Sequence, residues 1–377
     1  MTAVDERLDP KDLVLRFLAS IGRPREAESY LALYRARAAF AIVHASDPVV
    51  AGAVDALAAD LRLLDELGLR PVLTFGAIDP GGAVARAQAV AARVAHAEVV
   101  PAAEVEAVLA AGRLPLVPLS GPAIDARFDA LATLAARTGA EKLVFLGRRS
   151  GLQPRDGRVV SLVDLARPDD YDPLLATLPA RQAALLRQIA RLVDRVPHRV
   201  TVSVTSPLDL LRELFTVKGA GTLVRRGARV TRYGSWAELD APRLIALVED
   251  AFGRPLRADF RERAFASAYV ADDYRGAAIV TDTALAPYLS KFAVTTVARG
   301  EGVGGDLWRV LADEHPRLFW RSRAENPITA WYREQADGLV KRTIDGSAWV
   351  VLWRGLEPTE IALAVAICER TPPDFST

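Results

Sequence analysis

Lys291-Phe-Ala-Val-Thr-Thr-Val-Ala-Arg-Gly-Glu-Gly-Val-Gly-Gly-Asp-Leu-Trp308 is the stretch of this 377-residue chain that says most about its fold. The apolar run Leu289–Val294 predicts a β-strand, and a glycine-rich loop leads from it into a helix expected over Gly304–Glu314. Glycines let the backbone approach an anion closely, and the first turn of a helix offers N–H groups and the positive end of the helix dipole. The pattern therefore predicts a cradle for a pyrophosphate group.

The order Arg-x-x-Gly-x-Gly in this loop resembles the acetyl-CoA loop of the GNAT acetyltransferases. The dinucleotide pattern Gly-x-Gly-x-x-Gly fits less well, because no acidic ribose partner stands out after a later strand, and the Walker pattern is absent. A glycine-rich turn can also serve only to connect a strand tightly to a helix. For so short a motif taken alone, this alternative is about as well supported as a binding site for acetyl-CoA. In the GNAT enzymes the strand before the loop holds the thioester, and its N–H groups polarise the carbonyl. The resemblance implies an acetyl-CoA site made by Phe292, Ala293, Val294, Arg299, Gly300, Gly302, Gly304 and Gly305.

A second group of polar residues follows an apolar strand expected at Leu318–Arg321. Arg321, Arg323, Asn326 and Tyr332 lie within about a dozen positions of one another. Arginine suits carboxylates because its two parallel N–H groups match the two carboxylate oxygens. We therefore expect a carboxylate-binding site here. A surface strand with solvated arginines and packed aromatic rings is the alternative, and it is preferred only for the two tryptophans of this stretch, Trp320 and Trp331.

Residues 240–356 resemble the acetyltransferase domain of the N-acetylglutamate synthases, of the vertebrate-like type and the bifunctional bacterial synthase/kinases. The blocks that carry the resemblance are Phe252–Leu256, Asp273–Ile279, Pro287–Val294, Gly300–Gly304, Phe319–Arg323, Asn326–Ile328, Trp331–Tyr332 and Gln335–Gly338. The resemblance implies that Lys291, Arg321 and Asn326 line a glutamate pocket, with Arg323 a weaker candidate for the same pocket. It also implies that Tyr332 donates a proton to the departing CoA thiolate.

The first part of the chain alternates between segments typical of strands and of helices, which indicates a parallel sheet covered on both faces. Parts of residues 12–230 resemble the amino-acid kinase domain of the same proteins. Working kinases carry a Lys-x-Gly-Gly turn where this chain has His44-Ala-Ser-Asp47, and a triple-glycine turn where it has Gly76-Ala-Ile-Asp79. Without the lysine and the glycines, phosphoryl transfer lacks its electrostatic stabilisation. We therefore predict an inactive kinase fold with a regulatory and assembly role.

The stretch after residue 210 lies where arginine-sensitive members of the family bind arginine. The resemblance implies that Lys218, Gly219 and Gly221 contribute to an L-arginine site. A glycine-rich turn that only closes the sheet is an equally good reading. The resemblance also implies a homo-oligomer.

Composition limits the other possibilities. A formal net charge of +1 gives no electrostatic reason to expect binding to nucleic acid or to an anionic membrane. One cysteine and four scattered histidines do not suggest a disulfide framework or a metal centre. No run of residues is apolar enough to predict a membrane span, and the opening residues lack the apolar core of a secretory signal, so a cytoplasmic protein is expected.

The expected architecture is α/β: an N-terminal amino-acid-kinase-like parallel sheet sandwich over residues 1–236 and a C-terminal α+β GNAT acetyltransferase domain over residues 237–377. The shift in composition supports this division, because all six tryptophans follow residue 235. The leading hypothesis is an enzyme that transfers acetyl from acetyl-CoA to L-glutamate. An acetylglutamate kinase and a non-catalytic arginine sensor are the alternatives.

Overall fold

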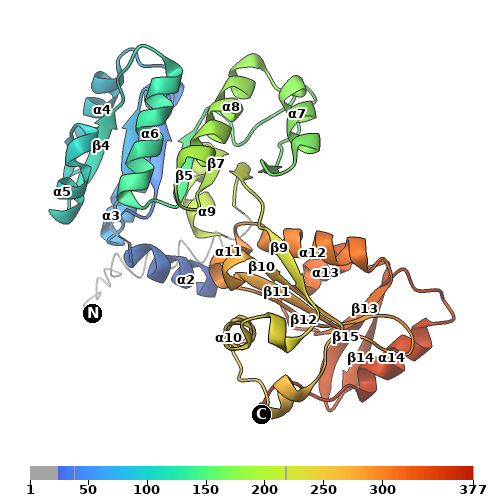
Figure 1. The fold of residues 1–377 in the computed structure, drawn as a ribbon. Helices are drawn as coiled ribbons and strands as arrows, with labels where there is room; N and C mark the ends of the chain where they lie inside the picture. The colour runs from blue at the N-terminus through green and yellow to red at the C-terminus, as the bar shows by residue number, and fades with distance from the viewer. Residues whose placement is uncertain (1–23, 38, 217–218, 377) are drawn as a thin grey trace, which may run out of the picture. The chain divides into compact units, whose positions relative to one another are not determined.

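The computed structural model describes residues 24–37, 39–216 and 219–376. The chain divides into two compact units, Met1–Arg226 and Gly227–Thr377 (Figure 1). The sequence placed this boundary between residues 236 and 237, because Arg232–Ala241 has the composition of a linker. In the structure Val230–Tyr233 forms strand β9, which pairs with β10 of the second unit and so moves the division toward the N-terminus.

The first unit is built on an eight-stranded sheet in the order β3-β4-β2-β1-β5-β7-β8-β6. All neighbours in it are parallel except β7 and β8. The central strands β1, β2 and β7 consist of apolar and small residues, apart from His44 in β1, and are buried along their whole length, as expected for strands covered on both faces. The strands are β1 Ile42–Ala45, β2 Val72–Phe75, β3 Ala97–Val99, β4 Leu114–Pro118, β5 Lys142–Leu146, β6 Leu162–Asp164, β7 Thr201–Thr205 and β8 Thr222–Arg225.

Helices cover both faces of this sheet and bury one apolar cluster on each side. Helices α2, α3, α4 and α9 contribute to the first cluster, and α5, α6 and α8 contribute to the second. The sandwich predicted from the alternating segments is confirmed. The helices are α2 Pro24–Arg35, α3 Asp47–Glu66, α4 Ala83–Ala91, α5 Val105–Ala110, α6 Ile124–Thr138, α7 Pro168–Thr177, α8 Ala180–Arg195 and α9 Leu210–Phe215.

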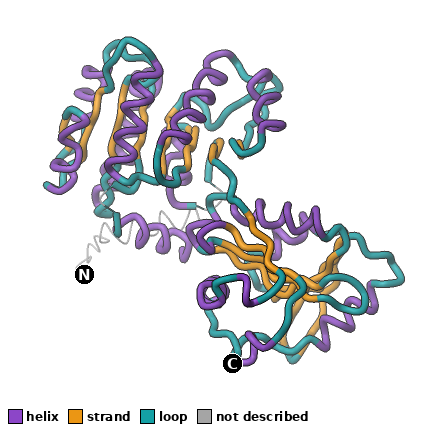
Figure 2. The backbone as a smooth tube through the Cα atoms, in the orientation of Figure 1, coloured by secondary structure: helices purple, strands orange, loops and turns teal. Residues whose placement is uncertain are grey.

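The second unit is built on a seven-stranded sheet in the order β14-β15-β13-β12-β11-β10-β9 (Figure 2). Its neighbours are antiparallel except for β12 and β13. Apolar residues of α12 and α13 pack on one face, and those of α10 and α14 pack on the other. The strands are β10 Ser267–Ala271, β11 Gly276–Thr281, β12 Tyr288–Val294, β13 Leu318–Arg323, β14 Gly338–Ile344 and β15 Ser347–Arg354, and the helices are α10 Ala241–Phe252, α11 Thr296–Arg299, α12 Val303–Glu314, α13 Thr329–Gln335 and α14 Ile361–Arg370.

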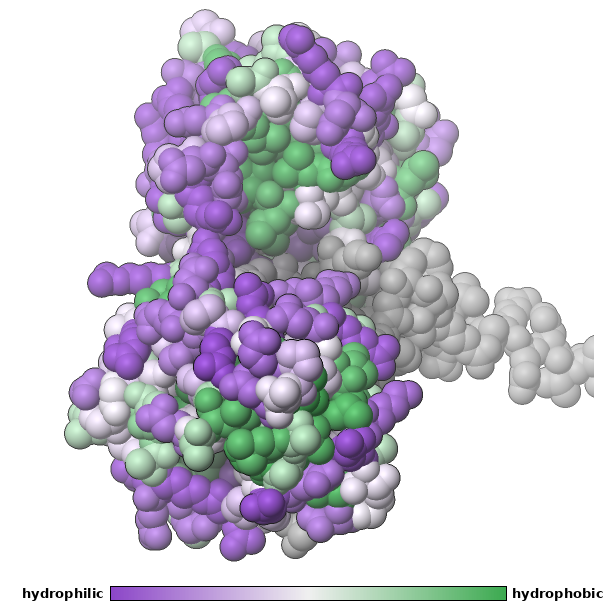
Figure 3. All heavy atoms as spheres, turned by 90° about the vertical axis from the view of Figure 1, so that its right-hand side faces the viewer, coloured by the Kyte–Doolittle hydropathy of each residue, from purple (hydrophilic) through white to green (hydrophobic). Residues whose placement is uncertain are grey.

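The face of each unit that Figure 3 draws is largely polar. Figure 3 shows that hydrophobic residues gather in limited areas of each unit on the face it presents. Among the described residues, no helix is both long enough and apolar enough to cross a membrane.

Candidate active site

Strands β12 and β13 separate in the middle of the second sheet. They pair at two positions, Tyr288 with Phe319 and Leu289 with Trp320. Beyond these positions β12 continues to pair with β11, while β13 pairs with β15 on its other side. From Lys291 onward, the backbone edge of β12 that faces β13 therefore has no strand partner among the described residues, and we call this gap in the pairing the opening. This is the strand from which the sequence predicted thioester binding.

Tyr332 of α13 lies at this opening. Its ring centroid is 6.2 Å from that of Phe292 on β12 and 5.6 Å from that of Trp320 on β13. The tyrosine is buried, and burial raises the pKa of its phenol above the ordinary value. A phenol that stays protonated near neutral pH can donate a proton, which is what the predicted role of Tyr332 requires.

The glycine-rich loop joins β12 to α12 as predicted. Thr295 caps the short helix α11 by accepting a hydrogen bond from the N–H of Ala298 (3.3 Å). Gly302 then precedes α12 with a φ of 77°, a left-handed conformation that favours glycine. Apart from its chain neighbours and the backbone of its own helix, no described atom lies within 4 Å of the place where a side chain on Gly305 would begin. A helix start with this much open space suits a pyrophosphate group.

Two arginines shape the loop. Arg299 donates hydrogen bonds to the carbonyl oxygens of Val294 (3.1 Å) and Ala251 (3.2 Å), so the structure uses it to brace the loop. Arg275 forms an ion pair with Glu301. This pairing offsets the negative charge that Glu301 would otherwise place beside a bound phosphate. Sequence reasoning missed Arg275, which lies outside the glycine motif.

Replacing Gly302 by Ala is expected to raise the KM for acetyl-CoA by about tenfold. A left-handed conformation costs an L-residue about 1–2 kcal/mol, and relaxing that strain moves the start of α12. Gly346→Ala is the matched control, because Gly346 has a φ of 70° and open space around it, in the turn between β14 and β15. Steady-state kinetics would contradict this prediction if both variants changed the KM equally.

Lys291 is the most deeply buried of the predicted substrate-binding residues, with 4% of its surface exposed. An irregularity in the pairing of β12 with β11 falls at Ser290, and the Lys291 ammonium donates to the Ser290 carbonyl oxygen (3.1 Å). Burial lowers the pKa of Lys291, while an ion pair with Asp374 acts in the opposite direction. Arg263 also donates to the Asp374 carboxylate (2.6 Å). One carboxylate is thus held between two cations.

The other predicted residues lie on β13 and the turn after it. Arg321 stacks on Trp349, with its guanidinium carbon 4.6 Å from the ring centroid, and donates to the carbonyl oxygens of Cys368 and Pro372. Arg323 lies over the same ring. Asn326 accepts a hydrogen bond from the N–H of Ile328 (3.3 Å), which orders the turn leading into α13. The structure thus brings Arg321 and Lys291 to one segment, residues 372–374, whereas Asn326 is engaged locally.

In the kinase-like unit, the turns after β1 and β2 are held by hydrogen bonds within the protein, at the positions where working kinases bind phosphate groups. His44 is buried beside Thr74, and burial together with the nearby Arg86 lowers its pKa to about 3, so it is neutral. Arg86 donates to the Asp47 carboxylate (2.9 Å) and to carbonyl oxygens of the loop after β2. Arg127 donates to three further carbonyl oxygens, two of them in that loop: Ala77, Ile78 and Gly121. The loop is therefore fixed by side chains of the protein itself.

The predicted arginine site is only partly described. Lys218 lies outside the described residues. Gly219 and Gly221 both have left-handed backbones. A side chain on Gly219 would collide with the Glu213 carboxylate, and one on Gly221 would collide with the Val204 carbonyl oxygen. Glu213 is buried and bonded to Ser203, Lys142 and the N–H of Ala220. Both glycines are thus required by close packing, which is the structural alternative to a ligand site.

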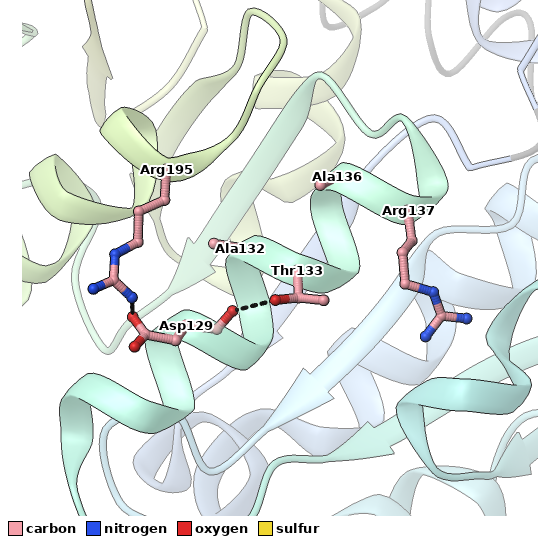
Figure 4. Close-up of a pocket in the computed structure, with 6 residues that line it drawn as sticks. All are labelled: Asp129, Ala132, Thr133, Ala136, Arg137 and Arg195. Atoms are coloured by element: carbon pink, nitrogen blue, oxygen red, sulfur yellow. Dashed lines mark hydrogen bonds and ion pairs between the residues drawn. The ribbon is translucent and has the colours of Figure 1, made fainter.

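A separate depression lies on the surface of α6 and α8 (Figure 4). Its carboxylate, that of Asp129, is paired with Arg195, and the Thr133 hydroxyl donates to the Asp129 carbonyl oxygen (2.9 Å). Because these polar groups satisfy one another, we assign no ligand to it. Among the described residues, no group of three or more acidic, histidine or cysteine side chains is placed to hold a metal ion.

Comparison with known proteins agrees with this division into two units. Residues 231–370 match the N-acetyltransferase domain of N-acetylglutamate synthase. The crystal structure of N-acetylglutamate synthase from Neisseria gonorrhoeae, complexed with coenzyme A and L-arginine, superposes with a TM-score of 0.54 at 20% identity, covering 88% of this chain and 98% of that one. These findings define the class: an amino-acid-kinase-like unit joined to a GNAT-type acetyltransferase unit.

The family follows from closer relatives. The acetylglutamate kinase of Xanthomonas campestris pv. campestris is 39% identical over 295 residues, which cover 74% of this chain and 68% of that protein. The mitochondrial N-acetylglutamate synthase of Homo sapiens is 35% identical over 237 residues, which cover 60% of this chain and 43% of that protein. The chain belongs to the family that contains these N-acetylglutamate synthases and acetylglutamate kinases, as the motifs indicated. It spans about two thirds of the length of its bacterial relatives and less than half of the human one.

Proposed function

We propose that this protein is an amino-acid N-acetyltransferase that transfers the acetyl group of acetyl-CoA to L-glutamate, the first step of arginine synthesis. The observation that carries the proposal is the opening between β12 and β13. Three features of this region support it: a stretch of β12 without a second strand partner, the buried phenol of Tyr332 packed against β12 and β13, and the buried cation of Lys291 on β12 itself. A transfer of acetyl to an amino acid needs these three groups: a backbone for the thioester, an acid for the thiolate and a cation for a carboxylate.

In the proposed mechanism, acetyl-CoA lies along β12 with its pyrophosphate at Gly300–Gly305. Lys291 and Arg321 hold the carboxylates of glutamate, with Arg323 and Asn326 as further candidates. The neutral amine attacks the thioester carbon, and N–H groups of β12 stabilise the oxyanion that forms. As the carbon–sulfur bond breaks, Tyr332 gives its proton to the CoA thiolate, the amine loses one proton to solvent, and Tyr332 regains a proton from solvent before the next turnover.

The release of free CoA thiol from acetyl-CoA tests this function. Release is expected to depend on L-glutamate and to be much slower with L-glutamine, which lacks the second charged carboxylate. A folded protein that releases no thiol with glutamate would remove the proposal.

Acetylglutamate kinase activity is the competing function, because the bacterial relatives carry that name. We expect no ATP binding and no phosphorylation of N-acetylglutamate. The neutral His44 gives no cation for phosphate, and Arg86 and Arg127 occupy the carbonyl groups of the loop that would have to open. Calorimetric titration with MgATP checks the prediction, with acetyl-CoA binding in the same sample as proof of folding. Saturable ATP binding would contradict it.

We also propose that the first unit has a regulatory and assembly role. The Neisseria gonorrhoeae structure contains L-arginine, which supports L-arginine as an effector near Gly219 and Gly221. Apolar areas on the surface are compatible with assembly into a homo-oligomer. Assembly, arginine sensitivity and a cytoplasmic location stay predictions.

A further inference from the structure

The residues that follow α14 enter the predicted amino-acid site. Asp374 places its carboxylate between the Lys291 ammonium and the Arg263 guanidinium. Two residues earlier, the carbonyl oxygen of Pro372 accepts a hydrogen bond from Arg321 (3.3 Å). Thus both residues expected to bind the two carboxylates of the substrate bind oxygens of residues 371–376. We call these residues the 371–376 segment.

The segment is held in place mainly by its backbone and by Phe375. Arg257 donates its N–H to the Asp374 carbonyl oxygen (2.9 Å), and Ser376 donates its N–H to the Pro255 carbonyl oxygen (3.0 Å). The Phe375 ring packs on Phe252, with centroids 4.9 Å apart. These three contacts are made with the end of α10 and the loop after it, whereas the Phe375 ring also lies beside β12, with its centroid 5.5 Å from the Lys291 ammonium. The Asp374 carboxylate can therefore part from the two cations while Phe375 keeps the segment attached, and the loss of these ion pairs is expected to loosen the two backbone hydrogen bonds.

Charge explains why an internal carboxylate belongs here. A buried ammonium without a partner is costly, so Lys291 needs an anion whether or not a substrate is bound. Several oxygens of the segment accept hydrogen bonds, among them both oxygens of the Asp374 carboxylate and the carbonyl oxygens of Pro372 and Asp374, but only the carboxylate brings a negative charge. The side chain of Asp374 ends in a carboxylate, as the side chain of an acidic amino-acid substrate does. It is 14% exposed.

We propose that Asp374 is an internal substrate mimic. Its carboxylate occupies a subsite, formed by Lys291 and Arg263, for one carboxylate of a dicarboxylic amino acid, and it leaves when that substrate binds. Arg263 thereby becomes a substrate-binding residue that the motifs did not indicate. Arg321, which now holds main-chain oxygens, takes the other carboxylate. This inference rests on the proposed function, which it deepens by assigning the substrate class and the exchange of carboxylates.

The first test compares Asp374→Asn with the wild-type protein in glutamate-dependent CoA release. If the mimic occupies the subsite about 90% of the time, its removal lowers the KM for glutamate about tenfold, because only the open fraction binds substrate. The kcat and the KM for acetyl-CoA are expected to stay unchanged. Asp259→Asn is the matched control, because Asp259 also pairs with Arg263 (2.9 Å) but is not bonded to Lys291. A KM that is unchanged or raised in folded Asp374→Asn overturns the proposal.

The second test does not depend on turnover or on a variant. Hydrogen exchange at the amides of Arg257 and Ser376 is measured in the wild-type protein with and without glutarate, a dicarboxylate without an amine. Faster exchange on adding glutarate supports displacement of the segment, whereas slower or unchanged exchange overturns it. If neither the wild-type protein nor Asp374→Asn releases CoA with glutamate, the proposed function is wrong. The exchange measurement still shows whether a dicarboxylate displaces Asp374.

Discussion

Replacing Tyr332 by Phe is expected to lower the kcat of glutamate-dependent CoA release by about 10²–10³-fold, the range typical of losing a general acid. The change removes one oxygen and keeps the ring that packs against Phe292 and Trp320. Both KM values are expected to stay close to those of the wild-type protein, because the lost interaction is made only as the thiolate departs.

A control separates chemistry from packing. Tyr233→Phe removes a phenol from β9, a strand far in the sheet order from the opening, and is expected to leave kcat unchanged. Thermal unfolding of both variants reports any loss of stability. A Tyr332→Phe variant with nearly full kcat would show that solvent or another residue protonates the thiolate.

The pH dependence gives an independent reading of Tyr332. Because burial raises the pKa of this phenol above the ordinary value of about 10, it stays protonated through the neutral and mildly alkaline range. Its role as an acid is therefore present at low pH and lost only as pH rises through the raised pKa. An alkaline fall in kcat near pH 8 that disappears in Tyr332→Phe would contradict the raised pKa of this phenol, although it would still support the role of Tyr332 as an acid.

Local patterns predicted the core of the second unit well. The strand Tyr288–Val294 and the helix Val303–Glu314 lie where the sequence placed them, because an apolar run, a glycine-rich turn and helical spacing are all short-range signals. Strand β14, Gly338–Ile344, was not predicted. It lies at the edge of its sheet and is largely polar and exposed, so it lacks the alternation that marks a half-buried strand. Strand β9, Val230–Tyr233, was also not predicted, because it overlaps residues whose composition is typical of a linker.

The site itself was predicted only where a motif carried it. Lys291, Arg321 and Tyr332 lie on β12, β13 and α13, the elements around the opening, and their roles stay predictions. Arg263 and Asp374 could not be found, since Asp374 meets Lys291 across 83 positions of sequence and neither belongs to a recognisable pattern. Such a pairing depends on how the 371–376 segment returns to the sheet, which periodicity does not encode.

Replacing Lys291 by Met is expected to raise the KM for glutamate at least about 30-fold and to leave the KM for acetyl-CoA unchanged. Removing one partner of a buried charge pair costs about 2–5 kcal/mol, and every 1.4 kcal/mol is tenfold in affinity. Met is similar in length to lysine, and it places an apolar end where the ammonium lies over the rings of Phe260 and Phe375. Lys341→Met, on the exposed edge strand β14, is the control and is expected to change neither constant.

The double variant Lys291→Met/Asp374→Asn tests whether Asp374 and the substrate carboxylate bind the same subsite. If Asp374 and the substrate carboxylate compete for Lys291, the gain in glutamate affinity from Asp374→Asn shrinks when Lys291 is absent, because Arg263 alone then holds either anion. Two independent effects would instead add, and Asp374→Asn would lower the KM by the same factor in both backgrounds. The four KM values of this cycle thus distinguish a shared subsite from two unrelated roles.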